Sequence, residues 1–262
     1  MPRNLVCHIY PLLKTGTWIR TVQHLRARSE LFDGQRIISV ALGPGTAMPE
    51  EVLEAFGDFE AVYRFVPNDE QLWEGASFAG LLNAFADAPG ETFYCHSKGA
   101  SHPADHVSQR WADVMFHLCL DYPATVADTL RLCPIAGPCM RVEKRMNVEW
   151  HYSGTFFWFY ESAIHSRAVR LDDRNCVERW PALNWEHTVA GNLGLMDCRN
   201  LYDEINWRSW ITRRFQKEIL WNEDRRSERS RCPTNWEEIP ATVFQPLQVV
   251  YTEAIADKGA TT

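Results

Sequence analysis

The chain has 262 residues, which is enough to bury the core of one large α/β domain, and we expect one domain rather than two small ones. A hydrophobic content of 45% with 12% aromatic residues excludes a disordered chain. The formal net charge of -7 argues against a general nucleic-acid coat, because non-specific binding to phosphate backbones needs a basic surface.

Strand-type and helix-type segments alternate along the first hundred residues. The apolar runs are short and end at proline or glycine, which is typical of strands between crossovers. In chain order we expect a strand at 4–10, a helix at 18–28, a strand at 36–42, a helix at 49–56, a strand at 61–66, a helix at 72–86 and a strand at 91–95. This alternation predicts a mainly parallel sheet flanked by helices, a Rossmann-like α/β fold.

The remaining chain continues with helical and aromatic segments. We expect a long helical stretch at 108–132 that breaks near 122–123, a strand at 135–141, a loop at 142–150, an aromatic strand at 151–160 with a bend at Gly154, and helical residues to 165. A helix is predicted at 206–221. Residues 1–200 therefore form the predicted domain, and residues 201–262 form a helical C-terminal extension packed on it, with a frayed tail.

A small polar loop follows the strand at 91–95. It holds an imidazole, a hydroxyl and an ammonium group at His96, Ser97 and Lys98, and Gly99 lets the backbone turn and approach a ligand. In an open α/β sheet ligands collect outside the carboxyl ends of strands, and a lysine suits a phosphate oxygen. The loop predicts a site for a nucleotide diphosphate. The alternatives are a solvated loop lysine and a capping or core histidine.

Two segments in the same order resemble a known family. Tyr-Cys-His-Ser-Lys-Gly at 94–99 and His-Tyr-Ser-Gly-Thr-Phe-Phe-Trp at 151–158 are similar to the motifs Tyr-x-His-Thr-Lys-Gly and His-Phe/Tyr-Ser-Gly-Asn/Thr-Phe-Trp-Trp of a group of bacterial GT-A-like glycosyltransferases. Weaker similarities occur at 8–11, at Trp18, at 28–39, at Asn68 with Glu74, and at 177–181. The resemblance spans roughly residues 5–210.

The resemblance implies a GT-A-like domain that binds a nucleotide-diphosphate sugar. By this comparison the donor-binding residues are Tyr10, Asn68, Glu74, His96, Ser97, Lys98 and Gly99. The wider class carries a DxD metal motif where this chain has His96-Ser97-Lys98. Because a lysine offsets phosphate charge directly, we expect donor binding without a divalent metal and no cofactor. Asn68 and Glu74 have an alternative in turn and helix-cap chemistry.

The resemblance also suggests which residues act on the acceptor. An inverting transfer needs a carboxylate base, and Glu178, Glu186 and Glu161 are the candidates. Glu178 matches the family's Val-Glu-x-Trp-Pro, with His96 as a second catalytic residue; a structural carboxylate at a helix N-terminus is the alternative for Glu178. The predicted acceptor-binding residues are His151, Ser153, Gly154, Trp158 and Trp180, with core packing as the alternative for Trp158.

The predicted activity is sugar transfer to a saccharide or a lipid-linked saccharide, as in polysaccharide biosynthesis. A non-catalytic nucleotide-sugar or glycan-binding protein is the alternative, and a phosphate-ester hydrolase is a third. The spacing of His96, His102 and His106 with Asp105 does not match a zinc site, so we expect no metal.

No secretory signal or long apolar run is present, and the eight cysteines lack a Cys-x-x-Cys pair, so we expect a cytoplasmic protein with reduced thiols. The predicted helix over 207–221 carries tryptophans and basic residues. It is either a packing helix or a peripheral contact with the inner face of a membrane.

Overall fold

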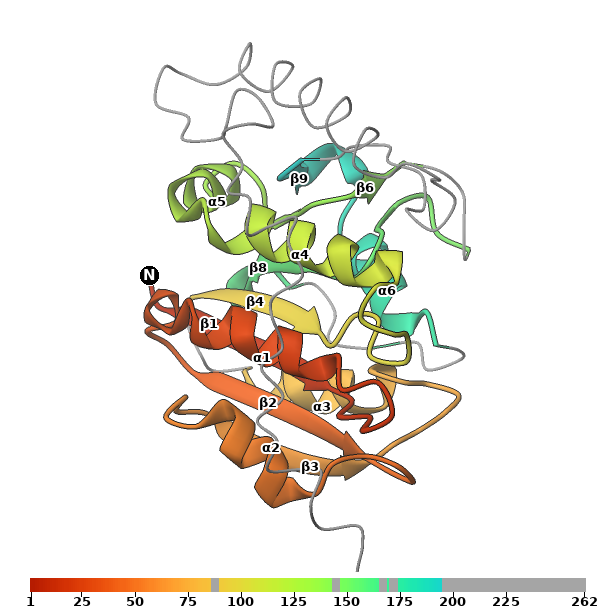
Figure 1. Ribbon diagram of the computed structural model, residues 1–262. Coiled ribbons are helices and arrows are strands. Elements are labelled where there is room, and N and C mark those ends of the chain that lie inside the picture. Colours follow the sequence, from red (N-terminus) through yellow and green to blue (C-terminus); the bar gives the residue numbers. More distant parts are fainter. Residues whose placement is uncertain (86–89, 143–146, 165–168, 170–173, 195–262) are drawn as a thin grey trace, which may run out of the picture.

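A seven-stranded sheet runs through the computed structural model, which describes residues 1–85, 90–142, 147–164, 169 and 174–194 (Figure 1). Its strands are β1 (Arg3–Ile9), β2 (Arg36–Leu42), β3 (Val62–Pro67), β4 (Glu91–His96), β5 (Ile135–Gly137), β8 (Phe157–Tyr160) and β9 (Ala190–Asn192). They lie in the order β3-β2-β1-β4-β8-β5-β9. All neighbouring strands are parallel except β8, which runs antiparallel to both β4 and β5. The expected mainly parallel sheet is confirmed.

Helices cover both faces of this sheet. The helices α1 (Trp18–Arg26), α2 (Pro49–Phe56), α4 (Val107–Leu120) and α5 (Pro123–Leu130) pack on one face, and α3 (Gly75–Ala84) and α6 (Cys176–Asn184) pack on the other. Single 3-10 turns lie at Ser29–Leu31, Glu161–Ala163 and His187–Val189. Two short strands, β6 (Met140–Arg141) and β7 (His151–Tyr152), pair outside the main sheet.

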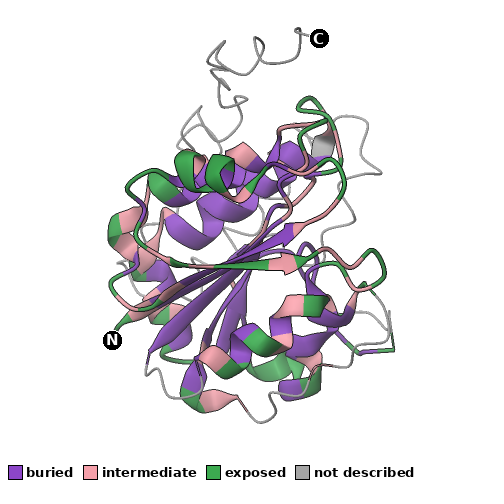
Figure 2. Ribbon diagram, turned by 90° about the horizontal axis from the view of Figure 1, so that it is seen from below, coloured by how far each residue is buried: buried purple, intermediate pink, exposed green. Residues whose placement is uncertain are grey.

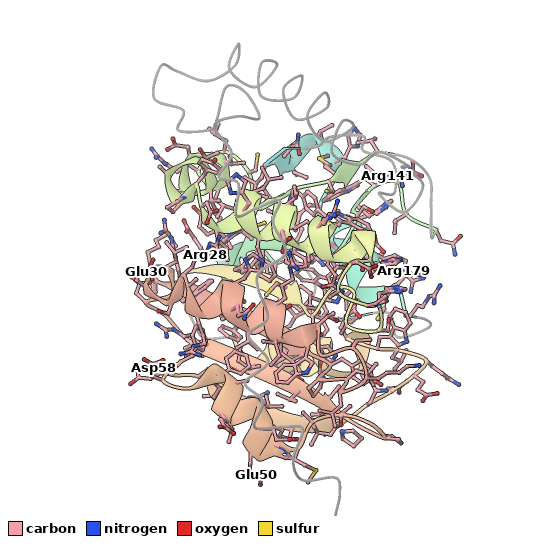
Figure 3. All side chains as sticks on the ribbon, in the orientation of Figure 1. Arg28, Glu30, Glu50, Asp58, Arg141 and Arg179 are labelled. Carbon is pink, nitrogen blue, oxygen red and sulfur yellow. The ribbon has the colours of Figure 1, made fainter. Side chains whose placement is uncertain are left out.

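Alternation along the strands divides the core into two halves. In β1, Leu5 and Cys7 belong to the half under α1 and α4, whereas Val6 belongs to the half under α3 and α6. Both halves consist of buried side chains from the inner strands and the inner helix faces, whereas the edge strand β3 is largely exposed (Figure 2). Charged side chains such as Glu30, Glu50 and Asp58 are exposed at the outside of the molecule (Figure 3).

Most expected elements occur where the sequence predicts them, and three differ. The helix expected at 72–86 begins only at Gly75, because Asp69 accepts hydrogen bonds from the backbone N–H groups of Gln71 and Leu72 and holds a turn there. The strand expected at 135–141 is split into β5 and β6. The aromatic strand expected at 151–160 is split into β7 and β8, with a tight turn between them.

The predicted extension over 201–262, its helix at 206–221 and the membrane contact of residues 207–221 lie outside the described residues. Within the described ranges, no helix combines the length and apolar character that a membrane span requires.

Candidate active site

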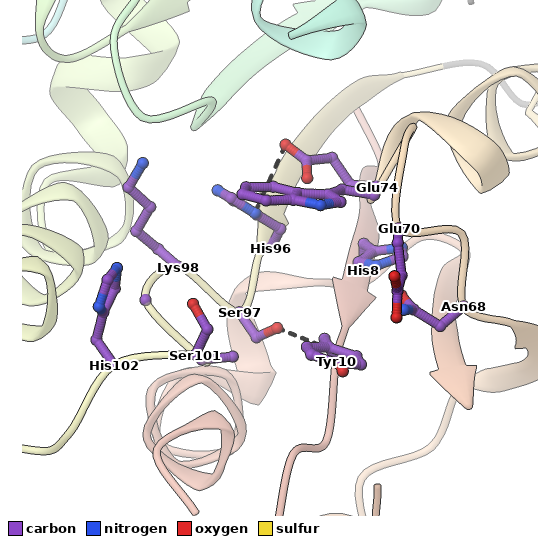
Figure 4. A pocket seen from close by; sticks show the side chains of 13 residues that line it. His8, Tyr10, Asn68, Glu70, Glu74, His96, Ser97, Lys98, Ser101 and His102 are labelled. Atoms are coloured by element: carbon purple, nitrogen blue, oxygen red, sulfur yellow. Dashed lines mark hydrogen bonds and ion pairs between the residues drawn. The ribbon is translucent and has the colours of Figure 1, made fainter. Parts of the chain in front are cut away.

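A pocket of about 460 Å³ opens beyond the carboxyl ends of β1 and β4 (Figure 4). These strands are neighbours, and His8 of β1 lies in register with His96 of β4, so the chain segments that follow them meet at one edge of the sheet. All of the residues expected to bind a donor line this pocket, namely Tyr10, Asn68, Glu74, His96, Ser97, Lys98 and Gly99. Their binding role stays a prediction.

The Lys98 side chain is half-buried and brings a cation to the pocket. Its Nζ lies 4.3 Å from the centre of the Trp111 ring, in a cation–π contact. Burial lowers the pKa of Lys98, and the negative charges of Glu178 and Glu74 oppose that effect. Within the described part of the chain the ammonium forms no ion pair closer than 4 Å. Lys98 is therefore not a solvated surface lysine, and its role as an anion-binding group stays a prediction.

Ser97 and Gly99 shape the loop. The Ser97 hydroxyl accepts a hydrogen bond from the Tyr10 backbone N–H at 2.8 Å, so it ties the loop after β4 to the end of β1. Gly99 has a φ of 77°, and a Cβ there would lie 2.4 Å from the Ser108 hydroxyl oxygen. The expected turn at Gly99 is confirmed, but the atoms that approach it closely belong to α4.

His96 is a neutral hydrogen-bond donor. Its Nε2 lies 3.1 Å from the Gly154 carbonyl oxygen, which can only accept, so Nε2 carries the hydrogen. Burial, together with the positive charge of Lys98, lowers the pKa of His96 to about 3. A group with so low a pKa is a weak base at neutral pH, which argues against proton transfer by His96 and leaves it a hydrogen-bonding role.

Glu74 and His8 lie beside His96 in the pocket and are both buried. The Glu74 Oε1 lies 3.7 Å from the His96 Nδ1, and burial raises the pKa of the Glu74 carboxyl. His8 contacts the Ser77 hydroxyl at 3.0 Å, and burial lowers the pKa of His8 to about 4. Sequence reasoning missed His8 as a lining residue, although its place one residue before the end of β1 was a usable signal.

Trp73 is a second lining residue that sequence reasoning missed. It has a φ of 51°, unusual for a bulky residue, and 46% of it remains exposed. The Arg174 guanidinium lies 5.0 Å from the centre of its ring. An exposed aromatic ring at the rim of a polar pocket is suited to stacking against a planar group. Glu70, Ala100, Ser101 and His102 complete the lining.

Of the three carboxylates considered as the base, Glu178 lies closest to this site. Its Oε1 accepts a hydrogen bond from the Gly154 backbone N–H at 3.3 Å, and its charge acts on Lys98. Glu161 is buried and accepts from the Thr92 hydroxyl at 2.9 Å, and Glu186 is exposed. Glu178 itself does not line the pocket, and it lies in the first turn of α6, so its structural alternative also fits this contact.

The residues expected to bind the acceptor are more buried than the sequence suggests. Trp158 is 2% exposed and Trp180 is 0% exposed, and both pack in the core, so neither forms a wall for a sugar ring as expected. His151 is also fully buried, with Nε2 3.9 Å from the Glu178 Oε1. Ser153 is buried, and its backbone N–H donates to the Cys139 carbonyl.

Gly154 connects the two motifs instead of leaving room for a sugar. Its N–H donates to Glu178 and its carbonyl accepts from His96, so one residue contacts both. A Cβ at this position would lie 2.6 Å from the Met115 sulfur, so the space above it is filled by core side chains.

The charged groups on the pocket lining are of both signs. Glu70 and Glu74 are carboxylates, whereas Lys98 is a cation, which repels a metal ion. Donor binding without a divalent metal stays a prediction. In the described ranges no group of three or more His, Cys, Asp and Glu side chains is placed to hold a metal. His102 and His106 stack on each other with ring centres 4.0 Å apart.

No family model and no curated protein matches the chain. Solved structures with a related arrangement include 4-diphosphocytidyl-2C-methyl-D-erythritol synthase from Anaerococcus prevotii, at 10% identity and a TM-score of 0.39 over 72% of this chain and 88% of that one. A provisionally named nucleotide-diphospho-sugar transferase from Desulfovibrio desulfuricans is 13% identical, with a TM-score of 0.43 over 86% and 96% of the two chains. Glucosyl-3-phosphoglycerate synthase from Mycobacterium tuberculosis, in complex with Mn2+, UDP and glucosyl-3-phosphoglycerate, is 12% identical, with a TM-score of 0.41 over 84% and 79%. Likenesses this distant assign neither an activity nor a ligand to this chain.

Proposed function

We propose that this protein is a glycosyltransferase that takes a sugar from a nucleotide-diphosphate donor, without a divalent metal, and transfers it with inversion to a saccharide or lipid-linked saccharide. The observation that carries the proposal is the ammonium of Lys98 in a pocket at the carboxyl ends of parallel strands. A half-buried lysine with no ion pair in the described ranges is suited to bind an anion. The motif resemblance points to the same class.

The pocket offers different chemistry for each part of such a donor. Lys98 offsets the charge of the diphosphate and stabilises the leaving group as its charge develops. The rings of Tyr10 and Trp73 lie on the lining and are suited to a nucleobase. Glu178 is the proposed base, because it is an ionisable carboxylate beside Lys98 and is held by the Gly154 N–H.

The test measures nucleotide release and donor binding side by side. The wild-type protein is incubated in EDTA with a panel of nucleotide sugars and candidate acceptors, and released nucleoside diphosphate is quantified. Binding is followed by thermal shift, because a ligand of the folded state raises the apparent stability.

Glu178→Gln is the decisive variant. We expect acceptor-dependent release to fall by about two orders of magnitude or more while the donor-induced thermal shift is kept, since a base acts on the acceptor and not on the donor. Glu186→Gln, at an exposed carboxylate on a nearby segment, is the control and is expected to keep full turnover. Binding without release for any acceptor would instead identify a non-catalytic nucleotide-sugar-binding protein. A near-normal rate in Glu178→Gln would remove Glu178 from the mechanism.

A further inference from the structure

The pocket has two chemically different ends. In Figure 4, Lys98 and His102 lie on one side, Asn68 and Glu70 lie on the other, and Glu74 faces His96 between them. A diphosphate is attracted by the Lys98 end. It is repelled by a carboxylate such as Glu74, so the region around Glu74 calls for a different part of the ligand.

His96 presents a hydrogen-bond acceptor to this region. Its Nε2 is committed as a donor to the Gly154 carbonyl oxygen, and the ring is neutral. The other ring nitrogen, Nδ1, is therefore a bare lone pair. The dashed line in Figure 4 marks the contact between this nitrogen and the Glu74 Oε1.

Glu74 presents a second acceptor. Its Oε1 lies 3.7 Å from the His96 Nδ1, which is too long for a hydrogen bond between the two. Glu74 is 7% exposed and lines the pocket, so bulk water does not satisfy its carboxyl fully, and a hydrogen bond from its own backbone N–H satisfies only part of it. His8, the other imidazole beside it, is also buried, and its Nδ1 contacts the Ser77 hydroxyl. The Glu74 carboxyl and the His96 Nδ1 thus lie side by side on the pocket wall, and at 3.7 Å they form no hydrogen bond with each other.

We propose that Glu74 and His96 together recognise two neighbouring hydroxyl groups of the ligand, a vicinal diol, each acceptor taking one O–H hydrogen bond. This inference rests on the proposed function and deepens it. The diol belongs either to the ribose or to the transferred sugar of the donor, and both sources carry the same chemistry. Lys98 then takes the diphosphate on its own side of the pocket, which sets the direction of the donor.

The test changes one acceptor and one ligand hydroxyl at a time. Glu74→Gln keeps the shape of the side chain but replaces the carboxylate with a weaker, neutral amide. Glu54→Gln, at an exposed carboxylate of α2 that does not line the pocket, is the matched control. Calorimetry without metal follows four probes: inorganic pyrophosphate, ribonucleoside diphosphates, their 2′-deoxy and 3′-deoxy forms, and nucleotide sugars.

We expect Glu74→Gln to weaken the binding of diol-bearing probes by roughly 10- to 100-fold, through the loss of one strong hydrogen bond, and not to weaken the binding of pyrophosphate. If the ribose is the source, the deoxy forms bind wild type more weakly by a similar factor and Glu74→Gln no longer distinguishes them. If the transferred sugar is the source, only nucleotide sugars are affected by the variant. The comparison of deoxy probes and nucleotide sugars on wild type tests the proposal even if the variant does not fold.

Three results overturn the proposal. The first is nucleotide binding that responds neither to Glu74→Gln nor to loss of any ligand hydroxyl, and this leaves the proposed function standing. The second is a loss of pyrophosphate affinity in Glu74→Gln as large as that of the nucleotides, which would place the phosphates at Glu74. The third is binding that requires Mn²⁺ and loses that requirement in Glu74→Gln, which would make the pair a cation site. Absence of binding by every nucleotide and nucleotide sugar overturns the proposed function together with this inference.

Discussion

Replacing Gly154 by alanine tests the link between the two motifs. Gly154 has a φ of 100°, a region that L-residues rarely adopt, and its N–H and carbonyl hold Glu178 and His96. An added Cβ would lie 2.6 Å from the sulfur of Met115 and 3.2 Å from the Trp111 ring. Met115 is a flexible side chain, but it is fully buried, so it has no free space into which to move.

The backbone conformation costs about 1–3 kcal/mol for a residue with a Cβ, and overpacking of a filled core costs a similar amount. We therefore expect Gly154→Ala to lower the free energy of unfolding by about 2–6 kcal/mol. This is measured by urea unfolding. Gly80→Ala is the control, because Gly80 lies inside α3 with no atom within 4 Å of the added Cβ, and it is expected to gain about 0.5–1 kcal/mol.

A free energy of unfolding of Gly154→Ala within about 0.5 kcal/mol of wild type, the range of an indifferent surface substitution, would contradict both the strain and the overpacking at this position. A variant that is destabilised as expected also tests the site. The peptide at 154 must shift to admit the methyl group, so the folded variant is expected to bind nucleoside diphosphates more weakly than Gly80→Ala does.

The titration of buried histidines and the exposed ring at the pocket rim give two more predictions. The pKa values of His8 and His96 are lowered to about 4 and about 3 in the folded protein. Below pH 6.5 the unfolded chain therefore binds protons at these two histidines that the folded chain does not bind. The stability that depends on their neutral state is complete above pH 6.5 and is lost as the pH falls towards 4. Between pH 7.5 and 5.5 each histidine lowers the free energy of unfolding by about 1.4 kcal/mol. The free energy of unfolding in urea is therefore expected to depend less on pH in the double variant His8→Gln/His96→Gln than in wild type. An equal pH dependence would contradict the lowered pKa values of the two histidines. Trp73→Ala is expected to weaken the binding of nucleoside diphosphates by roughly 10- to 100-fold in calorimetry, because base stacking is lost, and to leave the affinity for inorganic pyrophosphate unchanged. Equal losses of affinity for both ligands would exclude stacking.

Local sequence signals predict the bounds of a helix or strand where the residues of that segment alone determine where it begins and ends. The second strand and the second helix have the predicted bounds, Arg36–Leu42 and Pro49–Phe56, because a β-branched run ends at Gly-Pro-Gly and a proline begins the helix. The pocket lining at Ser97 and Lys98 was predictable for a similar reason. Residues that follow parallel strands necessarily share one edge of the sheet.

Features set by distant contacts were not predictable. The direction of β8 and the turn before it depend on pairing with β4, which no local pattern reveals. Helices cover both faces of the sheet, so alternate positions such as Phe157 and Trp158 are both buried, and periodicity cannot separate a sugar-binding wall from core. The approach of Glu74 to His96 joins the start of α3 to the end of β4, and only the folded chain brings them together.

The most direct test of the account is the affinity of a nucleoside diphosphate for Lys98→Met, measured by calorimetry in EDTA. Methionine keeps the packing against Trp111 but removes the charge that the diphosphate requires. We expect wild type to bind without metal and Lys98→Met to bind roughly 10- to 100-fold more weakly, with the exposed Lys14→Met unchanged. Equal affinity of wild type and Lys98→Met, or binding to wild type only when Mn²⁺ replaces EDTA, would contradict a donor site built on the lysine.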